Sequence, residues 1–166
     1  MEDYLNSLGR RNSNNTSVYD YNCGGYALNT FSWFYPSSES DWEKRDYFFR
    51  RELEEFTIEE VYHKYILRDA YNMIKSFNGR LRRINSIYDI RPGERVIAYR
   101  MCYDASDCET DFHFIFRDYN DKKWHHKPGD GYIQRNRFDT DYVLNHTWDY
   151  GYYNYDSEII LMALIL

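Results

Sequence analysis

The residues with the clearest chemical potential are one cysteine and a distant histidine. Cys23 begins an expected helix over residues 23–34, because apolar side chains follow it at three- and four-residue spacings. Backbone N–H groups at a helix start favour a thiolate, the nucleophilic form of cysteine. His113 begins an expected strand over residues 111–117, and an imidazole facing the thiol would accept its proton. The pair predicts nucleophilic thiol chemistry, although spacing alone is also compatible with two unrelated residues.

A third polar group is expected to orient the imidazole of His113, and two adjacent histidines on the returning strand are candidates. With a two-residue turn, Ile115 lies opposite His126, and both Trp124 and His126 share a face with His113. With a three-residue turn, His125 takes that face. We prefer His126, because Trp124 then packs inward beside it. An exposed polar strand end is the alternative interpretation.

A zinc site is a weaker alternative for the same region. Two thiols and the two adjacent histidines are the conceivable ligands, namely Cys102, Cys108, His125 and His126. The five-residue gap between the thiols is unusual for zinc, and adjacent strand residues point to opposite faces of a sheet. We therefore expect no metal and no other cofactor.

Composition limits the classes of partner. The chain has 166 residues with 21 Lys and Arg against 27 Asp and Glu, which gives a net charge of −6 and indicates one domain over residues 1–166. Nucleic-acid binding is not expected, because it depends on a surplus of cations. The sequence also has no membrane-length apolar run and no signal-peptide pattern at its start, so we expect a cytoplasmic protein that acts on a peptide or protein substrate.

The order of expected elements predicts an α+β fold. Residues 1–17 contain a short segment and a polar loop, and residues 18–79 should be helical, with capping boxes that begin helices at Ser40 and Thr57 and end them near residues 56 and 77. Residues 80–166 should form the sheet. Its expected strands are 81–84, 95–103, 111–117, 123–127 and a buried central strand at 158–165, whereas 130–151 has no clear assignment.

One cluster of cations remains outside this scheme. Arg80, Arg82 and Arg83 lie at or beside the first expected strand. They are able to bind an anion, but charges that protect a strand edge are the simpler interpretation.

Four motifs in order resemble those of the papain-like superfamily, within it the NlpC-type cell-wall peptidases and their CHAP relatives. Tyr21 to Gly25 is similar to the Asp-Cys-Ser-Gly helix start of that family, and Ile90 to Ile97 is similar to its Pro-Gly entry into the first core strand. His113 to Phe116 resembles the strand that begins with the catalytic histidine. Lys123 to His126 resembles the returning strand with the third polar residue, and Trp124 to Gly129 matches a Trp-x-His-Lys-Pro-Gly stretch of uncharacterised bacterial and phage proteins.

The resemblance implies N-terminal helices packed on a small antiparallel sheet, and a Cys–His–His triad of Cys23, His113 and His126. It implies a thiol-dependent amide or peptide hydrolase or transferase. The Cys23 backbone N–H would meet the oxyanion, and the further oxyanion or substrate-binding candidates are Asn22, Tyr21, Gly24 and Trp124.

The sequence departs from the family at Asn22, which replaces an acidic residue, and it includes no separate wall-binding domain. The alternative function is therefore a catalytically inactive papain-like shell that binds a partner, such as a phage-encoded inhibitor of a host defence protein. The high tyrosine content suits an interaction surface.

Overall fold

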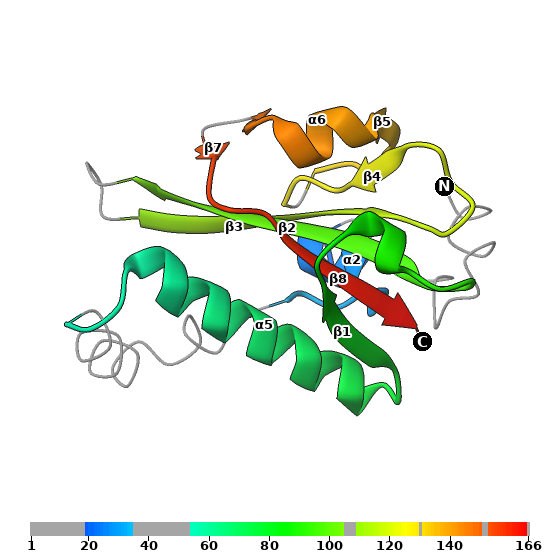
Figure 1. Ribbon diagram of the computed structural model, residues 1–166, viewed down its shortest axis with the longest axis horizontal. Helices are drawn as coiled ribbons and strands as arrows, with labels where there is room; N and C mark the ends of the chain where they lie inside the picture. The colour runs from blue at the N-terminus through cyan, green and yellow to red at the C-terminus, as the bar shows by residue number, and fades with distance from the viewer. Residues whose placement is uncertain (1–18, 35–53, 105–108, 130, 151–152, 166) are drawn as a thin grey trace.

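The computed structural model describes residues 19–34, 54–104, 109–129, 131–150 and 153–165. The polar loop expected before residue 18 and most of the helix expected from Ser40 lie outside these residues. Within them the fold is α+β with an antiparallel main sheet (Figure 1). No helix in the described ranges combines the length and apolar character that a membrane span requires.

The main sheet has six strands in the order β1-β8-β2-β3-β4-β5, and every neighbouring pair is antiparallel. Their bounds are β1 Arg80–Ile84, β2 Arg95–Asp104, β3 Glu109–Arg117, β4 Trp124–His126, β5 Gln134–Phe138 and β8 Ile160–Ile165. The expected strands of the sheet half are confirmed within a few residues. The C-terminal strand lies between β1 and β2 and is buried, as its continuous apolar run predicts.

A long helix, α5 (Ile58–Ser76), covers one face of this sheet (Figure 1). The predicted capping box is present, because Thr57 Oγ1 accepts from the Glu60 N–H and the Glu60 carboxylate accepts from the Thr57 N–H. At the other end, Asn78 has φ 59°, the left-handed stop expected before Gly79.

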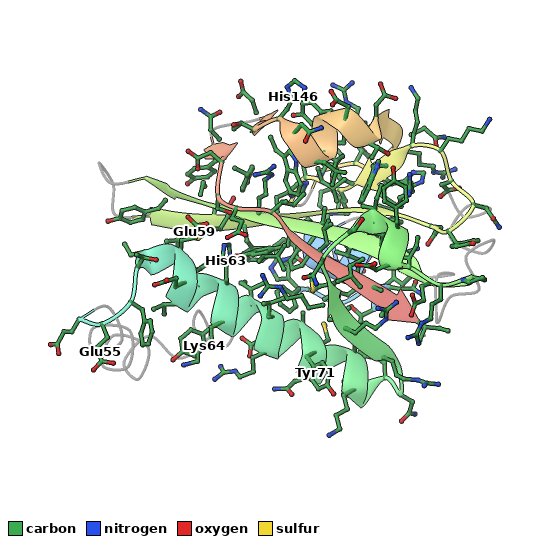
Figure 2. All side chains as sticks on the ribbon, in the orientation of Figure 1. Glu55, Glu59, His63, Lys64, Tyr71 and His146 are labelled. Atoms are coloured by element: carbon green, nitrogen blue, oxygen red, sulfur yellow. The ribbon has the colours of Figure 1, made fainter. Side chains whose placement is uncertain are left out.

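His63 connects α5 to the sheet. Figure 2 shows His63 and Glu59 on the side of α5 that faces the strands. His63 Nδ1 lies 3.1 Å from Tyr99 Oη, and its Nε2 lies 3.2 Å from Glu59 Oε1. The same Glu59 oxygen accepts from the Glu158 N–H. These bonds fasten the start of α5 to β2 and to the segment before β8.

The opposite face of the sheet is covered by elements that the sequence did not predict. They are α6 (Thr140–Asn145) and a two-stranded sheet of β6 (Trp148–Tyr150) and β7 (Tyr153–Tyr155). The sheet therefore separates two apolar cores, one under α5 and one under α6.

A short 3₁₀ turn, η2 (Ile87–Asp89), follows β1.

The helix predicted over residues 23–34 is much shorter than expected. Helix α2 spans only Cys23–Ala27, and both Asn29 and Phe31 have positive φ angles. The Gly25 carbonyl accepts from the N–H groups of Thr30 and Phe31, so the chain turns back on the helix. The apolar side chains that suggested a longer helix are buried all the same, because they line the first core from a loop. Burial periodicity alone did not distinguish the two conformations.

Arg95 holds this short helix against the sheet. Its Nη1 donates to the carbonyls of Tyr26 and Ala27, its other nitrogens pair with both carboxylate oxygens of Asp118, and its guanidinium lies 3.8 Å from the centroid of the Phe116 ring. One buried cation thus satisfies the last carbonyls of α2 and fixes the helix over β3.

Replacing Arg95 with alanine should lower the free energy of unfolding by about 3 kcal/mol, because it leaves a partly buried carboxylate and helix carbonyls without their donor. Urea denaturation of the variant measures the loss. Arg80→Ala is the matched control, because Arg80 is exposed, and its effect should stay within about 0.5 kcal/mol. Equal effects of the two substitutions would contradict this role for Arg95.

Candidate functional site

Cys23 and His113 line the same pocket. Its volume is about 260 Å³. The lining comes from the start of α2 and the loop after it, the first half of β3, the turn after β4, and β7. The lining residues are Asn22, Cys23, Trp33, Asp111, Phe112, His113, Gly129 and Tyr155. The two residues that the sequence singles out for thiol chemistry therefore meet at one cavity, although they are 90 positions apart in the chain.

The pocket lies where β3 extends beyond its neighbour. Strand β4 pairs with β3 only at Ile115 and Phe116, so the residues before Ile115 have no β4 partner. The Phe112 and Phe114 side chains belong to the core under α5, together with Cys23, whereas the His113 ring contacts aromatic groups on the other face. Strand side chains alternate between faces, so the Phe112 and Phe114 side chains and the His113 ring point to opposite sides of β3. The Cys23 thiol lies beside this part of the strand, since it lines the pocket with His113 and the backbone N–H of Phe114 hydrogen bonds to it.

The imidazole of His113 is held by a second imidazole. Its Nε2 lies 2.8 Å from Nδ1 of His126, and the rings are nearly perpendicular. Ile115 pairs with His126 across the strands, so the register predicted for a two-residue turn is confirmed and places His126 on the His113 face. His126 Nε2 in turn lies 3.1 Å from Oε1 of Gln134 on β5.

This chain of contacts determines the tautomers. The Gln134 oxygen can only accept, so His126 Nε2 carries hydrogen and His126 Nδ1 is the acceptor of a neutral ring. His113 must then donate from Nε2, and the lone pair of its ring lies on Nδ1. The arrangement prepares one nitrogen of His113 to act as a base.

Both rings are neutral near pH 7. Burial lowers the pKa of His113 well below its usual range, and the neighbouring His126 lowers it further. Burial also lowers the pKa of His126 to about 4, against the smaller opposing effect of the Gln134 hydrogen bond. A buried imidazole loses hydration that the cation needs more than the neutral form.

The thiol is neutral as well. Burial raises the pKa of Cys23 to about 12, and the negative charge of Asp111 raises it, whereas hydrogen bonds from the backbone N–H groups of Phe114 and Gly24 and the charge of Lys127 lower it. The expectation that a helix start would lower the pKa therefore does not hold, because only 4% of Cys23 is exposed and α2 is one short turn.

Two groups missed by the sequence analysis set the charge around the sulfur. The Asp111 carboxylate lines the pocket and accepts a hydrogen bond from Tyr155 Oη at 2.5 Å. Lys127 is fully buried, with its Nζ bonded to the Gly129 carbonyl and 4.9 Å from the centroid of the Tyr21 ring. A carboxylate and an ammonium group thus act on the thiol from different elements.

Asn22 and Gly24 have packing roles that differ from the expected substrate contacts. Asn22 lines the pocket, but its Oδ1 accepts from the Gly25 and Phe34 N–H groups and its Nδ2 donates to the Phe34 carbonyl. The amide is thus used to cap α2 and hold the following loop. A Cβ at Gly24 would lie 2.6 Å from Phe34 Cβ, and one at Gly25 would lie 1.8 Å from the Ser32 oxygen. The two glycines therefore leave room for the loop that carries Ser32 and Phe34, and not for a substrate.

Three other residues considered from sequence lie outside the pocket lining. Tyr21 and Trp124 have no exposed surface, which removes them as substrate contacts in this conformation; Trp124 donates from Nε1 to Thr140 Oγ1 within the core under α6. His125 points away from His113, with Nε2 bonded to Asp121 and Nδ1 accepting from the Asn136 N–H. Of the two adjacent histidines, His126 is therefore the one that contacts His113.

Gln134, Asp111 and Tyr155 could not be selected from sequence. Gln134 and Tyr155 lie on β5 and β7, two strands that the sequence did not predict. Asp111 and Tyr155 are 44 positions apart, so no local pattern indicates their contact. Lys127 was visible only as part of the Trp-x-His-Lys-Pro-Gly stretch.

Across the described ranges, no group of three or more His, Cys, Asp or Glu side chains is arranged to hold a metal ion. Cys108, one of the four conceivable zinc ligands, lies outside these ranges.

Comparison of the chain with protein-family models, with curated proteins and with solved structures gave no match. A functional proposal therefore rests on the residues of this chain alone.

The thiol should react slowly with iodoacetamide at pH 7, and its rate should rise about tenfold per pH unit up to at least pH 9, because only the thiolate is nucleophilic and the pKa is about 12. Asp111→Asn removes a repelling charge and keeps an acceptor for Tyr155, so it should speed alkylation at each pH. Mass spectrometry of the Cys23 peptide measures both rates.

The matched control is Asp149→Asn, which makes the same change of charge on an exposed residue outside the pocket lining and should leave the rate unchanged. A rate for the unmodified chain that is independent of pH between 6 and 8 would contradict the neutral thiol.

Proposed function

We propose that the chain is a thiol-dependent amide or peptide hydrolase or transferase, with Cys23 as nucleophile, His113 as base and His126 as the group that orients the base. The observation that carries the proposal is the hydrogen-bond sequence from Gln134 through His126 to His113, beside a pocket that also contains Cys23. A fixed tautomer with a basic Nδ1 is what a thiol needs in order to lose its proton during attack.

The neutral resting pair determines how the reaction begins. The Cys23 proton passes to His113 Nδ1 as the sulfur attacks the substrate carbonyl carbon, and the oxyanion is met by the Cys23 backbone N–H at the first turn of α2. The His113 imidazolium then protonates the leaving amine, which leaves a thioester on Cys23. Water, or another amine in a transferase, attacks the thioester and gives its proton back through His113, and the thiol is restored.

A papain-like fold is part of this proposal. It is supported by the short helix that carries the cysteine and the antiparallel sheet that carries the histidine, because the motifs that resemble that family lie on these elements.

An inactive binding protein is the second candidate, and the raised pKa of Cys23 favours it. In that case the two histidines are a buried polar pair that stabilises the sheet, and the cysteine is a packing residue. The candidates differ in one respect that can be measured, since only an enzyme transfers an acyl group to Cys23 with help from His113.

The test uses p-nitrophenyl acetate, whose small acyl group suits a pocket of about 260 Å³. We expect a burst of nitrophenolate and an acetyl group on the Cys23 peptide. His113→Gln should slow this acylation by about 10² or more, because general-base assistance is lost. Gln134→Leu should slow it about tenfold, because the His126 and His113 tautomers are no longer fixed. Stopped-flow absorbance and mass spectrometry of the acylated peptide give the rates.

The control chain carries Cys102→Ser and Cys108→Ser, so that Cys23 is the remaining thiol, and it should keep the full burst. Acylation of Cys23 at the same rate with and without His113, or no acylation at all, would favour the inactive binding protein.

A further inference from the structure

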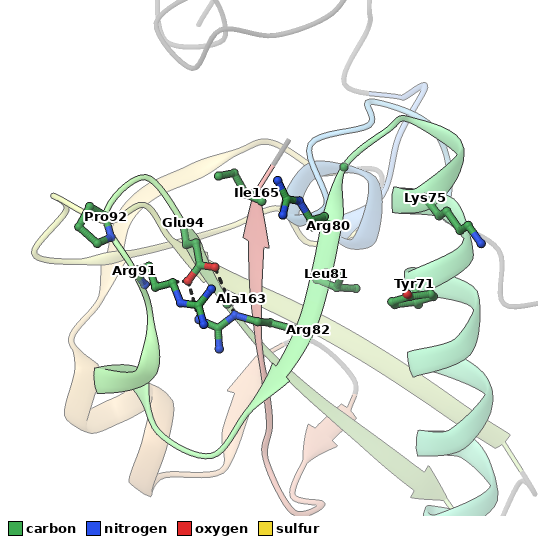
Figure 3. Close-up of a pocket in the computed structure, with 11 residues that line it drawn as sticks. Tyr71, Lys75, Arg80, Leu81, Arg82, Arg91, Pro92, Glu94, Ala163 and Ile165 are labelled. Carbon is green, nitrogen blue, oxygen red and sulfur yellow. Dashed lines mark hydrogen bonds and ion pairs between the residues drawn. The ribbon is translucent and has the colours of Figure 1, made fainter.

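A second pocket of about 510 Å³ lies at the β1 end of the main sheet, and its lining extends across β1 from Tyr71 on α5 to Ala163 on β8. The proposed thiol site uses none of these elements. It runs beside β1, between the end of α5 and the turn before β2. Figure 3 shows Arg80 and Arg82 on β1, Arg91 and Glu94 around the turn on one side, and Tyr71 on α5 on the other.

This hollow continues along the strand. A neighbouring pocket of about 290 Å³ shares Tyr71, Leu81 and Arg82 with the first one and reaches Arg83. Strand β1 is the end strand of the sheet, and it pairs on one side with β8 and, among the described strands, with no other. The two hollows therefore follow a sheet edge on which backbone N–H and C=O groups point outward.

The edge carries a surplus of positive charge, with four cations and the single carboxylate of Glu94 in the lining of the larger pocket. Lys75, Arg80 and Arg91 are exposed and line the larger pocket, and none of them forms an ion pair with the part of the chain that the structure describes. Arg82 differs, because Glu94 binds it at 2.7 Å and fixes its direction. These cations are grouped on one edge of a protein whose net charge is −6.

Charged residues on an edge strand by themselves protect a sheet from aggregation. Here two pockets lie beside the same strand. An added strand needs room for its side chains on both faces of the sheet, and the pockets provide it: Arg82 points to the face of Ala163, and Leu81 to the face of α5. The floor is apolar at Leu81, Ala163 and Ile165, while the rim is cationic.

We propose that β1 is a docking edge for an extended acidic segment of a partner polypeptide, which adds as a strand beside Arg80–Ile84. Backbone hydrogen bonds to β1 give the register, apolar side chains lie against Leu81 and Tyr71, and carboxylates meet Arg80, Arg91 and Lys75. The charge on this edge attracts acidic partners and repels basic ones, which is how complementary charge selects a partner.

The test uses a fluorescein-labelled peptide of alternating valine and glutamate, blocked at both ends, and fluorescence anisotropy with the full chain. Saturable binding that weakens as NaCl rises from about 50 to about 300 mM is expected. Arg80→Glu with Arg91→Glu should weaken it at least tenfold. Lys122→Glu, an equal change of charge per site at an exposed residue of the β3–β4 turn, should leave it unchanged.

Two further probes separate a strand from a simple anion. The same peptide with N-methyl groups on alternate residues keeps its charge but loses backbone donors, so it should not bind. A peptide with lysine in place of glutamate should not bind either. No saturable binding of the acidic peptide, equal binding of the methylated peptide, or full displacement by pyrophosphate at equal charge would overturn the proposal.

Thermal unfolding of the double variant tests whether misfolding causes the lost binding. The midpoint should be unchanged, because both side chains are exposed and neither forms an ion pair within the described residues. Acylation of Cys23 by p-nitrophenyl acetate should be the same in this variant, so failure of the docking edge and failure of the thiol chemistry are distinguishable.

Discussion

The hydrogen bond between Nε2 of His113 and Nδ1 of His126 is the constraint on which the candidate site depends. Two buried imidazoles can share only one hydrogen when both are neutral, so the bond assigns a donor and an acceptor. Gln134 determines which ring is the donor. Its oxygen accepts from Nε2 of His126, so Nδ1 of His126 accepts from Nε2 of His113, and the lone pair of the His113 ring lies on Nδ1. The strand register makes this possible, since a shift of one residue would bring His125 to this face instead.

The resting state that follows differs from a thiolate–imidazolium pair. Burial raises the pKa of the Cys23 thiol and lowers the pKa values of both rings, and Asp111 acts on the thiol in the same direction as burial. A neutral pair reacts only when a substrate carbonyl is in place, because proton transfer to His113 must accompany attack. Such a site reacts slowly with an alkylating reagent, which needs a thiolate formed beforehand, and is acylated when a carbonyl group lies beside the thiol and His113 takes its proton. The charge of the buried Lys127 beside the pocket favours the thiolate.

Sequence reasoning succeeded where a local pattern had one physical cause. The Thr57 capping box, the left-handed Asn78 and the alternation that puts His126 on the His113 face all follow from short-range geometry, and all are present. It failed where burial did not distinguish conformations, as in residues 28–34, in which Leu28, Phe31 and Phe34 fill the core from a loop and not from a helix. It also could not find Asp111 with Tyr155, or His126 with Gln134, because those contacts depend on how distant strands are brought together. The resemblance implies substrate contacts for Asn22 and Gly24, and no local pattern predicts that the loop at Phe34 lies against both residues.

The most direct measurement of the central claim is nitrogen NMR of the full chain with ¹⁵N-labelled histidine, recorded at pH 7. The account predicts a scalar coupling across the hydrogen bond between the two ring nitrogens, with hydrogen on Nε2 of both rings and an unprotonated Nδ1 on His113. In Gln134→Leu the two tautomers of each ring should mix. Two rings that titrate independently near pH 6.5 without any coupling would contradict it.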